Sequence, residues 1–228
     1  MSRSRIALLH PGSMGISIAA TLKRGGHDVC WLPLGRSRAT RQRAEQYDLT
    51  PVEKPEQLVD HCDLVLSICP PHAALEVAAW VGQLGFDGLY VDANAVSPAR
   101  SVEIGALVEA TGADYVDGGV IGGPAWQAGT TWLHLAGGQA GKVAELFSAG
   151  PLQTNVLGDQ IGQASALKMV FAGQTKGSRA LTCATLAAAK SLGVAGALQQ
   201  QWQALEMGLA EQAEPTLISA SRKAWRFA

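Results

Sequence analysis

Residues 6–26 read IALLHPGSMGISIAATLKRGG and contain the features that decide the fold. The apolar run Ile6–Leu9 predicts a short strand, and the stretch after Gly12 predicts an amphipathic helix that Gly25 and Gly26 can terminate. A glycine turn between a strand and a helix brings backbone N–H groups and the positive end of the helix dipole to one point. The segment therefore predicts a strand-turn-helix unit whose turn can bind an anion.

The spacing of the glycines favours the turn that holds the pyrophosphate of a dinucleotide. Gly12 would let the backbone approach the phosphates, and Gly15 would let the helix and strand pack closely. His10 stands where the G-x-G-x-x-G pattern has its first glycine, so the pattern is met only as H-x-G-x-x-G. The alternative is an ordinary glycine-containing turn, but the flanking strand and helix favour the dinucleotide site.

Beyond this unit, short apolar runs alternate with helical stretches. Parallel strands need crossover connections, so the alternation predicts an α/β protein, with a Rossmann-type, doubly wound, mostly parallel sheet covered by helices on both faces. We assign residues 1–159 to this NAD(P)-binding domain. The predicted strands are Ile6–Leu9, Val29–Leu32, Leu64–Cys69, Leu89–Asp92, Tyr115–Asp117 and Trp132–Ala136.

The alternation stops after Asp159. Residues 160–228 are rich in Ala, Leu, Gln and Lys, which predicts an all-helical C-terminal domain. Its first helix is expected to run from near Ile161 through Lys190, because no proline interrupts this stretch. No glycine or proline stop follows the final basic residues, so we expect this domain to be truncated.

Composition limits the class of protein and its partners. The chain has 228 residues, of which 47% are hydrophobic and 16% charged, which excludes a disordered protein. Eighteen basic and 19 acidic residues give a net charge of -1 without a basic run, so no nucleic-acid partner is expected. The four cysteines are scattered, which predicts neither a disulfide framework nor a metal site and favours a reducing cytoplasm. The first apolar run is too short for a signal peptide or a membrane span, so no membrane partner is expected either.

The end of the second predicted strand indicates which cofactor is bound. An acidic residue here would bind the ribose 2′-hydroxyl of NAD, but residues 31–43 read WLPLGRSRATRQR and contain no carboxylate. Arg36 and Ser37, followed by further arginines, offer donors suited to a 2′-phosphate. We therefore predict NADP as the cofactor, with NAD as the alternative. The competing interpretation is a solvated basic helix start.

Four segments resemble, in order and spacing, the β-hydroxyacid and 6-phosphogluconate dehydrogenase superfamily over roughly residues 5–175. They are PGSMGISIAATLKRGGHDV, VDANAVSP, YVDGGVIGGPAWQAGTTWLHLAGG and GQASALKMV, and the tail is similar to a branch with a C-terminal domain of unknown function. The resemblance implies hydride transfer in a cleft between a Rossmann domain and a helical domain that often dimerises. Lys168 aligns with the family's catalytic lysine, which exchanges a proton with the substrate oxygen. Without the resemblance, Lys168 would be interpreted as an exposed helix residue.

The chain departs from the family pattern at several positions. Ile121 stands where the family has a serine that contacts the substrate carboxylate, and Phe171 and Ala172 stand where it has an asparagine or a His-Asn pair. Asn94 and Ala95 replace residues of the D-x-S-T-x-S-P motif, although Asn94 can still hydrogen-bond the nicotinamide ribose or the substrate. These changes predict an apolar pocket for a bulkier, less acidic substrate than a hydroxyacid. The alternative is that they pack a domain interface.

Two functions follow from this pattern: an NADP(H)-dependent oxidoreductase for a small carbonyl, hydroxy, imine or amine substrate, and a non-catalytic NADP(H)-binding sensor or scaffold. We expect a cytoplasmic homodimer joined through the helical domain. Lys168 is the predicted catalytic residue. The predicted cofactor-binding residues are Pro11, Gly12, Ser13, Met14, Gly15, Arg36, Ser37, Cys69, Pro70 and Asn94. The predicted substrate-binding residues are Ile121, Gly122, Gly123, Trp126 and Phe171.

Overall fold

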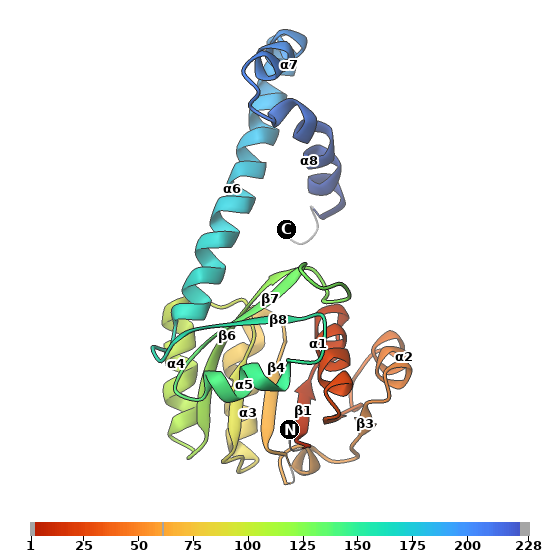
Figure 1. Ribbon diagram of the computed structural model, residues 1–228, viewed down its shortest axis with the longest axis vertical. Coiled ribbons are helices and arrows are strands. Elements are labelled where there is room, and N and C mark those ends of the chain that lie inside the picture. The colour runs from red at the N-terminus through yellow and green to blue at the C-terminus, as the bar shows by residue number, and fades with distance from the viewer. Residues whose placement is uncertain (1–2, 61, 224–228) are drawn as a thin grey trace. The chain divides into compact units, whose positions relative to one another are not determined.

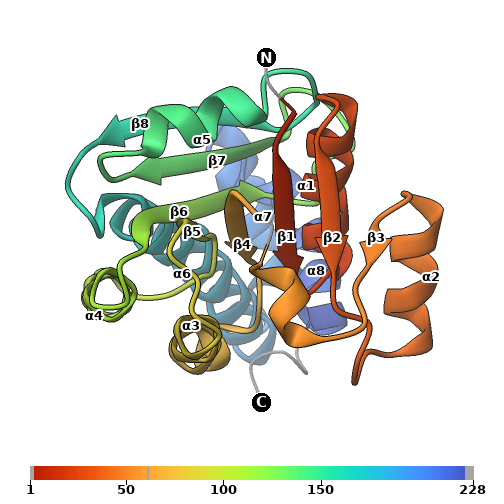
Figure 2. The ribbon, with the colours of Figure 1, turned by 90° about the horizontal axis from the view of Figure 1, so that it is seen from below.

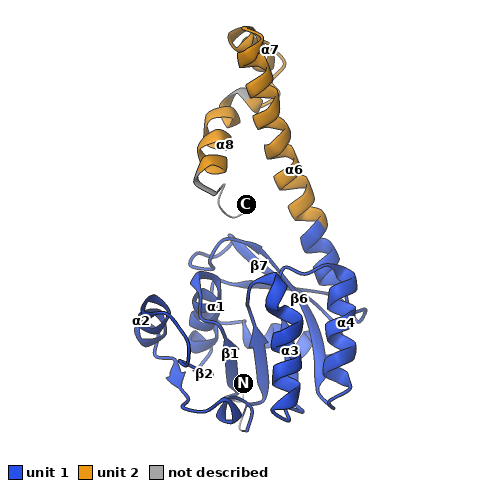
Figure 3. Cartoon of the chain, turned by 180° about the vertical axis from the view of Figure 1, so that it is seen from behind, with its two compact units in different colours: residues 1–169 blue, residues 170–228 orange. Residues whose placement is uncertain are grey.

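The computed structural model describes residues 3–60 and 62–223 (Figure 1). It divides into two compact units, residues 1–169 and residues 170–228 (Figure 3). The predicted boundary after residue 159 differs from this division, because the first turns of the long helix α6 (Gln163–Ser191) pack on the sheet of the first unit, where Ala164 and Ser165 are buried. The last five residues of the predicted helical domain lie outside the described residues.

The first unit is built on one sheet of eight strands in the order β3-β2-β1-β4-β5-β6-β7-β8. All neighbouring strands are parallel except the pair β6–β7, which confirms the predicted Rossmann-type, mostly parallel sheet. The strands are β1 (Arg5–Leu9), β2 (Asp28–Trp31), β3 (Thr50–Pro51), β4 (Leu64–Ser67), β5 (Leu89–Asp92), β6 (Asp114–Gly122), β7 (Thr131–Ala136) and β8 (Gln153–Gly158).

Helices cover both faces of this sheet, as Figure 2 shows. One buried cluster joins the sheet to α1 (Ser13–Arg24), α2 (Arg38–Gln46) and α5 (Ala140–Leu146). A second cluster, on the opposite face, joins it to α3 (Ala74–Gln83) and α4 (Pro98–Glu109). Alternate residues of β1 divide between the clusters, because successive side chains of a strand point to opposite faces.

Local sequence signals account for the helix ends that position the site. Gly25 terminates α1, and Gly26 follows in the left-handed region at φ 81°, as the sequence predicts. Ser37 caps α2 by accepting a hydrogen bond from the backbone N–H of Thr40. Ser97 caps α4 in the same way, and Pro98 occupies its first turn, where a missing N–H has no consequence.

The second unit contains the rest of α6, α7 (Ala195–Ala204) and α8 (Leu209–Lys223). Its core is small and consists of Leu186, Trp202 and Ala213, with Leu198 and Leu209 packed against it. Helix α6 has nearly the predicted bounds. Among the described residues, no helix has the length and apolar character needed to cross a membrane.

Candidate functional site

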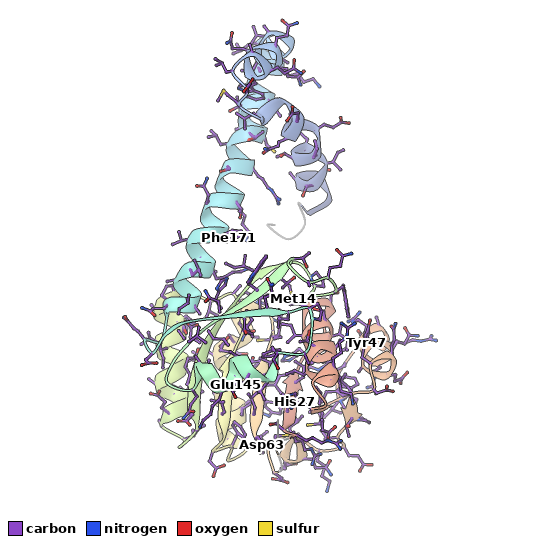
Figure 4. All side chains as sticks on the ribbon, viewed as in Figure 1. Met14, His27, Tyr47, Asp63, Glu145 and Phe171 are labelled. Carbon is purple, nitrogen blue, oxygen red and sulfur yellow. The ribbon has the colours of Figure 1, made fainter. Side chains whose placement is uncertain are left out.

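The carboxyl ends of β1, β2, β4 and β5 meet at one edge of the sheet, because these strands are paired in parallel. The residues that follow β1 form the predicted glycine turn and the start of α1. The first intrahelical bond runs from the N–H of Ile16 to the carbonyl of Gly12, so the N–H groups of Ser13, Met14 and Gly15 precede the helix ladder and can donate to a ligand. Gly12 caps α1 without a side-chain hydrogen bond. Figure 4 labels Met14 at this end of α1.

The two glycines of the turn have the properties that the sequence predicts for them. A Cβ on Gly12 would meet no described atom within 4 Å, so this side of the turn is open to a ligand. A Cβ on Gly15 would lie only 2.6 Å from the carbonyl oxygen of His10, which is closer than atoms can approach. Gly15 is therefore required where helix α1 crosses strand β1.

His10 occupies the position of the missing first glycine in a conformation that favours glycine, with φ at 76°. Its ring is largely enclosed, and its Nδ1 atom is buried without a hydrogen-bond partner among the described residues. Burial, followed by the nearby charge of Arg36, lowers the pKa of His10 to about 4. The imidazole is therefore neutral at neutral pH.

Arg36 and Ser37 lie in the turn between β2 and α2. The Nε atom of Arg36 is buried without a partner among the described residues, and burial lowers the pKa of this guanidinium. The Ser37 hydroxyl lies 3.1 Å from the Thr40 hydroxyl, and Arg43 Nε donates a 3.3 Å hydrogen bond to the carbonyl of Pro11. Helix α2, which follows the arginine turn, is thus tied directly to the glycine turn.

Asn94 ties together the ends of β4 and β5. Its side-chain oxygen accepts a 2.5 Å hydrogen bond from the N–H of Cys69, and its amide nitrogen donates to Ser67 Oγ at 3.1 Å. Its backbone N–H donates to the buried carboxyl of Asp92 at 2.8 Å, and burial raises the pKa of Asp92 to about 6. Pro70, which follows Cys69, is exposed at this edge of the sheet. Ser67 was not predicted as part of the site, because only the fold brings it beside Asn94.

Lys168 lies on the first part of α6, over β6. A Cβ on Gly119 would be 2.5 Å from the carbonyl oxygen of Ala164 and 3.2 Å from Lys168 Cβ, so the glycine lets the helix sit directly on the strand. One turn earlier, Ser165 donates to Asp117 through both its N–H, at 3.0 Å, and its hydroxyl, at 2.6 Å. Lys168 Nζ donates to the carbonyl oxygen of Val120.

The residues around Lys168 were not predicted as part of the site: Asp117, Gly119, Val120, Ala164 and Ser165. The double glycine at 118–119 is the signal that could have indicated the close approach. His134, which lies opposite Gly119 in the β6–β7 pair, was not predicted either. Burial, followed by the charge of Lys168, lowers the pKa of His134.

The predicted substrate residues are distributed along the end of β6 and beyond it. Ile121 is buried, Gly122 has φ at 123° and packs against Thr130 and Thr131, and Gly123 is exposed.

The loop after Gly123 is fastened to the helices of the cofactor side. Trp126 stacks on Tyr47 with ring centroids 5.2 Å apart, and the N–H of Ala125 donates to Ser17 Oγ at 2.8 Å. Tyr47, labelled in Figure 4, directly follows α2. Phe171 belongs to the second compact unit and is 46% exposed. The predicted apolar wall therefore remains a prediction.

Residues 5–149 match the NAD binding domain of 6-phosphogluconate dehydrogenase. The chain belongs to this family. An uncharacterized 28.5 kDa protein of Methanothermus fervidus is a curated relative, and it is 28% identical to this 6-phosphogluconate dehydrogenase-like chain over 160 residues. The match covers 70% of this chain and 61% of the relative, so the chain spans about three fifths of that relative's length.

Solved structures share the fold of this 6-phosphogluconate dehydrogenase-like chain. A conserved protein of unknown function, described as similar in structure to 3-hydroxyacid dehydrogenases, is 29% identical with a TM-score of 0.80, and the match covers 97% of this chain and 84% of that one. The Mycobacterium tuberculosis 3-hydroxyisobutyrate dehydrogenase is 19% identical with a TM-score of 0.72, covering 89% and 71% of the two chains. A reductive aminase from Aspergillus terreus, solved with NADPH, is 18% identical with a TM-score of 0.71, covering 97% and 77%.

The edge of the sheet fits the nicotinamide dinucleotide that the family binds. Open space at Gly12 and the donors at the start of α1 suit a pyrophosphate. Beyond β2, a cavity of about 250 Å³ is lined by His10, Leu32, Arg36, Glu76, Val77 and Trp80, which suits an adenosine group. Across residues 3–60 and 62–223, no group of three or more His, Cys, Asp or Glu side chains is arranged to hold a metal ion.

Proposed function

We propose that this chain is an NADP(H)-dependent oxidoreductase that transfers a hydride to or from a small carbonyl, hydroxy, imine or amine substrate. The observation that carries the proposal is the placement of the glycine turn, the Arg36 turn and Lys168 along the carboxyl edge of one sheet. The first two suit a phosphorylated dinucleotide, and the third is a cation that can exchange a proton. The three features together indicate an oxidoreductase more specifically than any one of them alone.

Arg36 is the residue that supports NADP(H) over NAD(H). Its guanidinium lines the cavity at the end of β2, where no carboxylate follows the strand, and it offers planar donors for a 2′-phosphate. Arg43, on the helix α2 that follows this turn, donates to the Pro11 carbonyl, which holds α2 against the glycine turn. Ser37 contributes mainly by capping α2, because its hydroxyl already accepts from the Thr40 N–H.

The proposed role of Lys168 is to move a proton at the reacting oxygen or nitrogen. A reduced nicotinamide, when bound, supplies a hydride to an electron-poor carbon. The electrons of the C=O or C=N double bond then move onto oxygen or nitrogen, and the Lys168 ammonium donates a proton to that atom; in the reverse direction, neutral Lys168 accepts it. Solvent restores the proton on Lys168. The hydrogen bond to the Val120 carbonyl orients the amine for this task.

The proposed substrate has an apolar body. Ile121 is buried at the end of β6 and has no polar group to hold a carboxylate. Asn94 is buried, and its oxygen accepts from Cys69 while its amide donates to Ser67, so one N–H and one lone pair are left for a ligand. An apolar carbonyl or imine compound is therefore favoured over a hydroxyacid.

The proposal includes a cytoplasmic homodimer joined through the helical unit. Four free cysteines suit a reducing compartment. Exposed apolar side chains on the helices and turns of residues 170–223 suit an interface, since the core of that unit is small. They are Val170, Phe171, Leu181, Leu192, Val194, Leu205, Met207, Leu217 and Ile218.

The second candidate function is an NADP(H)-binding sensor or scaffold without turnover. This function is favoured because Ile121 and Ala172 stand where the family has polar residues that hold a substrate. Both functions require the same cofactor pocket, so cofactor binding alone does not separate them.

Substitution of the lysine separates the two functions. We expect wild-type protein with saturating NADPH to reduce members of a panel of apolar ketones and cyclic imines. Lys168→Met is expected to lower kcat by about 100-fold or more, the size of a lost general acid, with NADPH affinity unchanged. Lys142→Met, on the exposed surface of α5, is the matched control and retains full activity. Undiminished turnover by Lys168→Met would contradict the assigned role, and NADPH binding without turnover by wild type on the whole panel would favour the sensor.

A further inference from the structure

His10 and Arg36 face one cavity at the end of β1 and β2. The cavity has a volume of about 250 Å³, which suits one part of a dinucleotide. Its remaining walls are the apolar side chains Leu32, Val77 and Trp80, with Glu76 from α3. A cavity with aromatic and aliphatic walls and the basic side chains of His10 and Arg36 suits an adenine nucleotide that carries an extra phosphate.

The backbone at His10 has a conformation that favours glycine over the histidine that stands there. Its φ of 76° lies in the left-handed region, which is unfavourable for a residue with a Cβ and not for glycine. Glycine would adopt this conformation freely, and the turn would still be made. An imidazole that replaces glycine at such a position and then faces the cavity is more than a turn residue.

Both nitrogen-bearing side chains have unused hydrogen-bonding capacity. Among the described residues, His10 Nδ1 and Arg36 Nε are buried without partners. Most buried polar atoms in proteins are hydrogen-bonded. Five other buried side-chain atoms of the described residues also lack a partner, but His10 and Arg36 both line this one cavity, which points to a group that binds there. A phosphate would satisfy this demand, because it is an acceptor of charge-assisted hydrogen bonds.

The charges around His10 keep it neutral without a ligand. Burial opposes protonation most strongly, and Arg36, from the turn after β2, opposes it next; a hydrogen bond with the Leu9 backbone favours protonation, but by less. Glu76 faces the cavity from α3, and Cys69, at the end of β4, interacts with Arg36. Arg43, from α2, donates to the adjacent Pro11 carbonyl. A doubly negative phosphate beside Arg36 would reverse the balance of charge at the imidazole.

We propose that His10 is a specificity-determining residue of the nucleotide pocket: its imidazole takes up a proton from solvent when the 2′-phosphate of an adenine nucleotide binds beside Arg36. The preference for 2′-phosphorylated nucleotides therefore strengthens as the pH falls. This inference rests on the proposed NADP(H) function and deepens it. It assigns a binding role to the residue that departs from the dinucleotide motif.

Linkage gives the size of the effect. If phosphate binding raises the pKa of His10 by about two units from its low value, affinity gains a factor of about ten between pH 8 and pH 5. The sign follows because the bound state then holds more protons than the free state between the two pKa values. Protonation of the phosphate itself works against binding in the same pH range, so the effect must be measured relative to a variant without the imidazole.

The test uses the full chain and adenosine 2′,5′-bisphosphate as the probe, with adenosine 5′-monophosphate for comparison. Calorimetric titrations at pH 6 in two non-phosphate buffers of different ionisation enthalpy give the number of protons taken up. His10→Gly and His10→Asn are the test variants, because both tolerate a positive φ and neither can be protonated. His72→Asn is the matched control, since His72 is exposed beside α3.

We expect wild type and His72→Asn to take up more protons with the bisphosphate than His10→Gly and His10→Asn do, and to show no such excess with the monophosphate. The ratio of wild-type to His10→Gly affinity for the bisphosphate should rise about tenfold from pH 8 to pH 5. Equal proton uptake and a constant ratio would overturn the role of His10 and leave the NADP(H) proposal standing. Tighter binding by His10→Gly at every pH would show that the imidazole obstructs the pocket. If neither wild type nor His10→Gly binds the bisphosphate, the NADP(H) proposal fails and this inference fails with it.

Discussion

Gly119→Ala tests how the sheet positions Lys168. The added Cβ would lie 2.5 Å from the carbonyl oxygen of Ala164 and 3.2 Å from Lys168 Cβ. Close carbon-to-oxygen contacts in proteins begin near about 3.3 Å, so the start of α6 must move by most of an ångström. Overpacking of this size typically costs about 1 to 3 kcal/mol. We expect the free energy of unfolding of residues 1–169 to fall by that amount, and Lys168 to be displaced from the Val120 carbonyl.

Gly123→Ala is the matched control from the same GGVIGG segment. A Cβ there meets no described atom within 4 Å, so stability should stay the same or rise by less than about 1 kcal/mol. Urea unfolding followed by tryptophan fluorescence is a suitable assay, because Trp31, Trp80, Trp126 and Trp132 lie in the first unit. Equal midpoints and slopes for the two variants would refute the close approach of α6 to β6.

Three further substitutions test the charges and hydrogen bonds of the site. Asp92→Asn should raise the free energy of unfolding by about 1 to 3 kcal/mol above pH 7, because burial raises the pKa of Asp92 to about 6 and the folded state disfavours the charged carboxylate above that pH. The gain in stability should shrink as the pH falls toward 4. Urea titrations at several pH values measure this gain. Ser165→Ala should lower the free energy of unfolding by about 1 to 3 kcal/mol, because Asp117 loses its hydrogen bond from the Ser165 hydroxyl, the shorter of the two from this residue. A loss of less than about 0.5 kcal/mol would contradict the role of Ser165 in anchoring α6 to β6. Arg36→Met should weaken NADPH binding about tenfold or more and leave NADH binding nearly unchanged. Arg24→Met, exposed in the last turn of α1, is the control, and equal weakening of both cofactors by Arg36→Met would exclude a 2′-phosphate contact.

The sequence predicts those parts of the fold that depend on local signals. The apolar run before Gly12 and the double glycine after Arg24 bound the β1–α1 unit without help from distant residues. The alternation of apolar runs and helical stretches gives the mostly parallel sheet for the same reason. Helix α6 is also predicted well, since its composition is helical throughout.

Strands that depend on their neighbours were missed or shortened. Strand β3 has two residues and exists because Cys30 and Trp31 offer a free edge. Strand β8 reads QTNVLG, and most of it stays accessible at the end of the sheet, so it lacks an apolar signature. The predicted strand 115–117 extends to Gly122, because its glycines pack against β5, α6 and the turn before β7 rather than bending the chain.

The site also has parts that local sequence predicts and parts that depend on distant residues. The glycine turn and the Arg36 turn could be predicted, because each lies within a few residues of its strand. The anchor of α6 could not, since Asp117 and Ser165 are 48 residues apart in the chain. The stacking of Trp126 on Tyr47 joins loops from distant segments, and no periodicity indicates it.

The measurement that tests the central claim most directly is a titration of the purified chain with NADPH and with NADH. Energy transfer from its six tryptophans to the reduced nicotinamide reports binding, and Trp80 lines the cavity itself. We predict saturable NADPH binding that is at least about tenfold tighter than NADH binding at pH 7. Equal or tighter binding of NADH would contradict the assignment of Arg36 to a 2′-phosphate, and binding of neither would contradict the proposed cofactor site as a whole.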